Sequence, residues 1–78
     1  MNTPEEVGAR LRYLRTKRHQ TIRAVAKEIP ISYPQLFKYE HGDLYPPVLT
    51  LGLLCEYYGV SADWLLGTGG NDAETPAL

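Results

Sequence analysis

The fold is decided by residues 21–42, which read TIRAVAKEIPISYPQLFKYEHG. Thr21 is a good N-cap for a helix in which Val25 and Ile29 lie one turn apart on an apolar face. Pro30 ends this helix, because proline lacks a backbone N–H and disfavours helical geometry at the residue before it. The pattern therefore predicts a short helix followed by an abrupt break.

A second helix is predicted over residues 32–40, directly after the break. Ser32 and Gln35 have the spacing of a capping box at its start. Gly42 then supplies the left-handed conformation that ends many helices. Two short helices separated by a break of about three or four residues form the skeleton of a helix-turn-helix.

The apolar residues of this segment also meet the packing needs of a helix-turn-helix. Ala26 is small where the two helices meet, and Ile31 is placed to plug the turn into the core. Leu36 and Tyr39 anchor the second helix from behind. The residues that then face outward are Tyr33, Pro34, Phe37 and Lys38. A helix presented in this way fits the major groove of DNA.

Three further helices flank this pair. Thr3 and Glu6 have the spacing of a capping box for a helix predicted over residues 4–18. A fourth helix is predicted to begin at Pro46-Pro47, and a fifth to cover residues 62–66. Apolar stripes at helical spacing support the first and the fourth, at Val7, Leu11 and Leu14 and at Leu51, Leu54, Cys55 and Tyr58.

The chain has 78 residues, which is room for one small domain. We expect an all-α bundle of five short helices over residues 4–67, followed by a disordered tail over residues 68–78. No apolar run approaches the roughly 20 residues of a membrane span, so no membrane contact is expected. The single cysteine, Cys55, cannot form an internal disulfide, which favours a cytoplasmic location.

The formal net charge of −1 hides an asymmetry along the chain. Residues 1–42 hold all eight basic residues and four acidic ones, for a net charge of +4. Residues 43–78 hold five acidic residues and no basic one, for a net charge of −5. The predicted helix-turn-helix lies in the basic part, and a basic surface is typical of nucleic-acid-binding domains.

Over about residues 5–67 the sequence resembles the Cro/CI-type (XRE) family of helix-turn-helix transcriptional regulators, which have a lambda-repressor-like DNA-binding domain. The resemblance rests on GARLRYLR at 8–15, Ala26, Ile31-Ser32, Leu36, Glu40-His41-Gly42, Pro47, Leu51 and GVSADWLL at 59–66. It implies a sequence-specific DNA-binding regulator, expected to be a repressor, that inserts helix 32–40 into the major groove of a double-stranded operator as a homodimer. The alternative is a protein-interaction module on the same fold, of antitoxin or anti-repressor type, with a protein partner.

The resemblance also implies which residues touch DNA. The expected base contacts are Ser32, Tyr33, Pro34, Gln35, Phe37 and Lys38. Lys38 suits a guanine edge or a phosphate, and Gln35 suits either adenine or the capping box. The apolar surface of Tyr33, Pro34 and Phe37 suits the thymine methyl group, with core packing or a protein partner as the alternative. The expected phosphate contacts are Arg10, Arg18, Thr21, Arg23 and His41.

Other positions carry structural implications. Arg15 and Glu40 match a family pair of arginine and glutamate, which joins the first helix to the end of the third. Ile22 stands where family members usually carry a glutamine that bonds a phosphate, and Pro30 where they usually carry a glycine in the turn. Because proline cannot adopt a positive φ, the turn is predicted to follow another path. The candidates for the dimer interface are Leu53, Tyr57 and Trp64, with core packing as the alternative for Trp64.

Catalysis and metal binding find little support in the sequence. The two histidines, His19 and His41, lack metal-ligand spacing to Cys55. Ser32 and Ser61 are explained by helix capping. No glycine-rich phosphate loop of the Walker type is present. We therefore expect no catalytic residue, no metal site and no cofactor.

Overall fold

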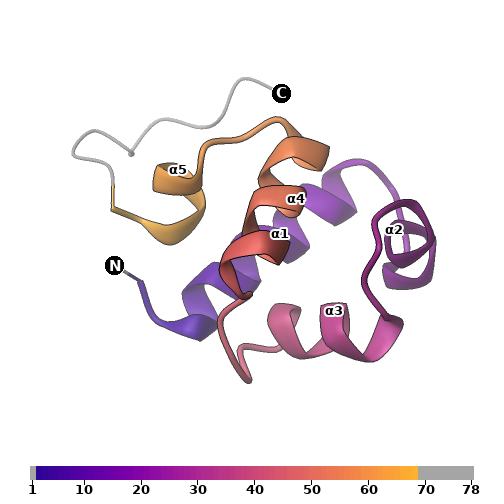
Figure 1. Ribbon diagram of the computed structural model, residues 1–78, viewed down its shortest axis with the longest axis horizontal. Helices are drawn as coiled ribbons and strands as arrows, with labels where there is room; N and C mark the ends of the chain where they lie inside the picture. The colour runs from indigo at the N-terminus through magenta and orange to yellow at the C-terminus, as the bar shows by residue number, and fades with distance from the viewer. Residues whose placement is uncertain (1, 69–78) are drawn as a thin grey trace.

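The computed structural model describes residues 2–68 of the chain (Figure 1). It contains five helices, which are α1 (Pro4–Lys17), α2 (Ile22–Glu28), α3 (Tyr33–Glu40), α4 (Val48–Tyr58) and α5 (Ala62–Leu66). No strand occurs within these residues. The prediction of an all-α bundle of five short helices is therefore confirmed. Apart from Thr68, the expected disordered tail lies outside the described residues.

The helices surround one core, with α2 and α3 on one side of the bundle and α5 on the opposite side (Figure 1). α1 runs between them and packs against both α3 and α5. α2 packs against α3, and α4 packs against α5. The α2–α3 pair therefore lies at the surface of the bundle. α1, the longest helix, packs against α3 on the side that faces the core.

Local side-chain bonds begin α1 and α3 where the sequence predicts. The Thr3 hydroxyl accepts from the Glu6 backbone N–H, and the Glu6 carboxylate accepts from the Thr3 backbone N–H. Ser32 and Gln35 form the equivalent pair of bonds at the start of α3. Both capping boxes satisfy backbone donors that the first turn of a helix leaves free.

The turn between α2 and α3 passes Pro30 without any positive φ. The residues with positive φ in the described part are His19, Gly42, Gly59 and Gly67. Ile29 is extended, and the Ile31 N–H donates to the Ile29 carbonyl at 2.7 Å. This i to i+2 bond is the pattern of a γ-turn, whose inverse form needs a central φ near −75° that proline adopts readily. The predicted change of path at Pro30 is thus a γ-turn, which changes the chain direction within three residues.

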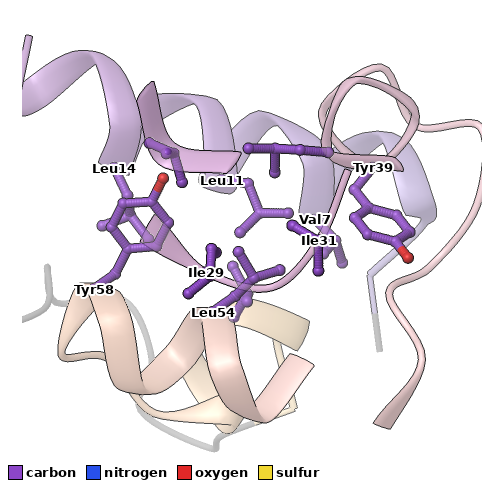
Figure 2. Close-up of a cluster of buried hydrophobic side chains, with 11 residues drawn as sticks. Val7, Leu11, Leu14, Ile29, Ile31, Tyr39, Leu54 and Tyr58 are labelled. Carbon is purple, nitrogen blue, oxygen red and sulfur yellow. The ribbon is translucent and has the colours of Figure 1, made fainter. Parts of the chain in front are cut away.

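The core is built from the apolar stripes and includes residues of every helix. Figure 2 shows Val7, Leu11 and Leu14 of α1 facing Leu54 and Tyr58 of α4. The remaining core side chains are Val25, Ile29, Ile31, Leu36, Tyr39 and Leu65. Ile31 is buried, in keeping with its expected position in the turn. On α4, the stripe is narrower than predicted, because Leu51 and Cys55 are only half-buried.

Candidate nucleic-acid interface

The outward face of α3 carries all the residues that the sequence suggested for base contacts. Ser32, Tyr33, Pro34, Gln35, Phe37 and Lys38 are all exposed. Leu36 and Tyr39 are buried on the opposite side of the helix. Tyr33 and Phe37 each keep 38% of their surface exposed, so the structure does not place them in the core. α3 therefore has a buried side, which packs against the bundle and is called the anchored side. Its exposed side, with the six residues named above, is called the free side.

Two of these polar residues are already bonded to the backbone of α3. The Ser32 hydroxyl accepts from the Gln35 N–H at 3.2 Å, and the Gln35 Oε1 accepts from the Ser32 N–H at 2.9 Å. Gln35 thus has the capping role that the sequence left open. A bidentate contact with adenine uses both the oxygen and the nitrogen of an amide, and the capping box occupies one of the two lone pairs of the Gln35 oxygen.

Arg15 and Glu40 fix α3 to α1. Arg15 Nε and Nη2 donate to the two carboxylate oxygens of Glu40 at 2.8 and 2.9 Å, and Nη1 donates to the Gln20 carbonyl at 2.8 Å. The Glu40 side chain is completely buried, whereas the Arg15 side chain retains 13% of its surface. Hydrogen bonding to Glu40 raises the pKa of Arg15 above its usual value. The pair that the resemblance implied is therefore present as a buried, bidentate bridge.

The backbones of α1 and α3 also approach closely at Gly8. A Cβ atom on Gly8 would contact the carbonyl oxygen of Tyr39 and lie 2.7 Å from that of Glu40. Both neighbours are backbone atoms at the end of α3, which a larger side chain cannot displace by changing rotamer. Gly8 and the Arg15–Glu40 pair together set the position of α3 relative to α1.

A shallow hollow of about 460 Å³ lies where the starts of α2 and α3 meet. Its lining consists of Arg15, Thr21, Ile22, Arg23 and Tyr33. The guanidinium carbon of Arg23 lies 4.9 Å from the centre of the Tyr33 ring, which is within cation–π distance. Ile22, which stands in the usual place of a glutamine, is half-buried and packs against the core.

The other arginines suggested for phosphate contacts have partners within the bundle. Arg10 lies 5.8 Å from the Trp64 ring centre and donates to the Asn2 side chain. Arg18 donates to the carbonyls of Tyr57 and Tyr58 at 3.2 and 3.1 Å. These contacts direct both guanidinium groups toward α4 and α5. Thr21, Arg23 and His41 are exposed on the side of α2 and α3.

The residues suggested for the dimer interface do not form one free surface. Tyr57 accepts from Gln20 Nε2 at 2.7 Å and donates to the Glu28 carboxylate at 3.1 Å. Trp64 is half-buried and packs against the core, which was its alternative role. Only Leu53 adjoins an exposed apolar face of α4.

Of this face, the sequence suggested Leu53 alone. Val48 and Leu49 keep 84% and 83% of their surfaces exposed. Gly52, one turn later, is exposed, and a Cβ built on it meets no atom within 4 Å. With Leu53 these residues share one side of the first half of α4. We call Val48, Leu49, Gly52 and Leu53 the α4 face.

The described part of the chain holds no cluster of metal-ligating side chains. No group of three or more histidine, cysteine or acidic side chains is placed to hold a metal ion there. Burial raises the pKa of the Cys55 thiol, which disfavours the thiolate that a nucleophile requires. The same part of the chain has no helix that is long and apolar enough to cross a membrane.

A family model described as "Helix-turn-helix domain" matches residues 8–70. The chain belongs to this helix-turn-helix family. The match includes α2, the Pro30 turn and α3, together with most of α1 and all of α4 and α5. The predicted membership of a helix-turn-helix family is therefore confirmed.

A solved structure supports the same assignment of fold. The helix-turn-helix chain is similar to the DNA-binding domain of BldD from S. venezulae, with a TM-score of 0.70 and 29% sequence identity. The match covers 81% of this chain and 94% of the BldD domain. A comparison with curated protein sequences gives no match.

Proposed function

We propose that this helix-turn-helix protein is a sequence-specific transcriptional regulator that inserts α3 into the major groove of DNA. The observation that carries the proposal is the free side of α3, which presents six exposed residues from a helix fixed at its far end by a buried ion pair. A rigid, exposed recognition helix is what the major groove admits. The BldD domain, which shares the fold, is itself described as DNA-binding.

Phosphate contacts are proposed for residues at the edges of α3. Thr21 and Arg23 lie at the hollow beside its start, and His41 follows its last turn. Positively charged or polar groups on either side of a recognition helix bind the phosphates that flank the groove. The guanidinium groups of Arg10 and Arg18 are directed toward α4 and α5, away from α3, so the proposal does not depend on them. The protein is proposed to act in the cytoplasm, where it meets DNA, and to do so without catalysis.

The regulator is proposed to act as a repressor in homodimeric form. Occupying an operator blocks transcription without any further contact, whereas activation needs a second partner surface. The α4 face supports the dimer, because two leucines and a valine beside a glycine allow a second helix to pack closely. A two-fold dimer doubles the DNA contacts of a small module, which raises affinity for a palindromic site.

The test of the function is a selection from duplexes with a randomised core, followed by fluorescence anisotropy. We expect the selected duplex to bind about 10³-fold more tightly than a scrambled one. Affinity is expected to fall with salt, at a slope of about 0.9 for each phosphate contact. Equal binding of all sequences would contradict specific regulation. An absence of salt-dependent binding to any duplex would favour the alternative, a protein-interaction module.

Lys38→Ala is expected to weaken binding to the selected duplex by about tenfold, because it removes an exposed cation from the free side of α3. If Lys38 contacts a phosphate, the salt slope also falls by about 0.9. Lys17→Ala at the end of α1 is the matched control, and its affinity should stay near that of the parent. A Lys38→Ala protein that binds as tightly as the parent would remove Lys38 from the interface.

Leu49→Asp is expected to convert the proposed dimer into a monomer, because it places a charge on the α4 face. Analytical ultracentrifugation measures the mass, and anisotropy should show weaker binding to a two-fold site. Tyr13→Asp is the control, because it places the same charge at an exposed hydrophobic residue of α1, outside the α4 face. It should leave the mass of the particle unchanged. A parent protein that is monomeric both free and on DNA would contradict the homodimer.

A further inference from the structure

The side chains on the free side of α3 form one continuous stack. The Tyr33 and Phe37 rings have centres 6.2 Å apart at an interplanar angle of 29°. The Phe37 and His41 rings are closer, with centres 3.9 Å apart and planes at 16°. Arg23 of α2 covers the other end, above the Tyr33 ring. Residues four apart share one side of a helix, so the stack runs along α3. We call Arg23, Tyr33, Phe37 and His41 the α3 stack.

Contacts within the α3 stack restrict its side chains. His41 Nδ1 lies 3.0 Å from the Phe37 carbonyl, to which it donates in the tautomer that carries the proton on this nitrogen. The close contact between the Phe37 and His41 rings restricts both side chains, which lowers the entropy they lose on binding. Preorganised aromatic side chains bury apolar surface at a low entropic cost.

The geometry of the rings favours a contact with their edges. One face of Phe37 is covered by His41, and one face of Tyr33 is covered by the Arg23 guanidinium. A protein that stacks the bases of a single strand needs free aromatic faces onto which each base can settle. The α3 stack instead offers the edges of its rings as a narrow apolar ridge beside Pro34.

Two polar side chains beside the ridge already have a capping role. Ser32 and Gln35 bond each other's backbone in the capping box. Along the free side of α3, the groups left without a capping role are the Tyr33 ring with its hydroxyl, Pro34, the Phe37 ring and the Lys38 cation, so the two rings and Pro34 supply its apolar surface. In the major groove, the apolar group on a base edge is the 5-methyl group of thymine.

We propose that the α3 stack reads DNA through the 5-methyl groups of thymine, so that A·T pairs at fixed positions in each half-site specify binding. This inference rests on the proposed function, because it names the chemistry by which α3 selects its sequence. Tyr33 and Phe37 provide the contact surface, and His41 and Arg23 hold the two rings in place.

The experiment compares two versions of the selected duplex, one made with thymine and one with uracil. Uracil keeps the base pairing and the phosphates, but it lacks the 5-methyl group. We expect the uracil duplex to bind about fourfold more weakly for each methyl group buried by the protein. Equal affinities for the two duplexes would overturn the inference while leaving sequence-specific binding intact. A failure to select any specific duplex would instead overturn the proposed function, and with it this inference.

Variants locate the effect on the protein. Phe37→Ala should reduce the ratio of thymine to uracil affinity toward one, because the ridge loses its central ring. Tyr33→Ala is a second variant with the same expected outcome, and circular dichroism verifies that each protein is folded. Tyr13→Ala removes an exposed aromatic ring from α1 and should keep the parent ratio. A Phe37→Ala or Tyr33→Ala protein that binds both duplexes with the parent ratio would show that the methyl group acts through DNA shape, and would overturn the inference.

Discussion

Glu40→Gln is expected to destabilise the domain by about 3 kcal/mol, the largest effect predicted for a single substitution here. The substitution leaves the shape of the side chain nearly unchanged but removes the charge that faces Arg15. The Arg15 guanidinium would then remain largely buried without its counter-ion, since only 13% of its side chain is exposed. A fully exposed pair of this kind would contribute about 1 kcal/mol or less, so the burial decides the magnitude.

Thermal and urea unfolding measure this effect. In a domain of this size, a loss of about 3 kcal/mol lowers Tm by roughly 15 °C. Glu56→Gln in α4 makes the same chemical change at an exposed site, and we expect less than about 0.5 kcal/mol there. If the two variants unfolded alike, the Arg15–Glu40 bridge would not stabilise the position of α3.

Gly8→Ala is expected to destabilise the domain by about 2 kcal/mol, although alanine is the better helix former. The added Cβ collides with the backbone at the end of α3, where no rotamer change relieves it. The collision would separate α1 from α3 and stretch the Arg15–Glu40 bonds. Chemical unfolding gives the free energy, and the direction of the change is the decisive readout.

Gly52→Ala is the matched control, because it makes the same change in α4 with no atom near the added Cβ. Helix propensity alone then acts, and we expect a gain of roughly 0.5–1 kcal/mol. Unfolding should be followed at a concentration where the chain is monomeric, since Gly52 belongs to the α4 face. Two alanine variants with the same sign would contradict the close approach of α1 and α3 at Gly8.

Features that depend on a few neighbouring residues were predictable from the sequence. The capping boxes at Thr3 and Ser32 were recognisable because their partners lie three residues away. The stop at Pro30 follows from its ring, so the break between α2 and α3 needed no tertiary information. The core stripe of α1 was also clear, because Val7, Leu11 and Leu14 recur at helical spacing.

The surfaces proposed for binding were less predictable, for two physical reasons. The α3 stack brings Arg23 of one helix over Tyr33 of another, and no sequence spacing encodes that distance. In α4 the apolar residues occur on nearly every side, so periodicity does not distinguish the buried Leu54 from the exposed Leu49. Arg18 illustrates the first reason again, since its carbonyl partners lie about forty residues away.

The division of α3 into an anchored side and a free side has an evolutionary consequence. Leu36, Tyr39 and Glu40 hold the helix, and their replacement endangers the whole fold. The exposed positions 33, 34, 37 and 38 lie outside the core, so under the proposed function substitutions there would alter the DNA sequence that is read while the scaffold survives. Under that proposal, selection would retarget the protein to a new operator in single steps, and duplicated copies would diverge in specificity before they diverge in structure.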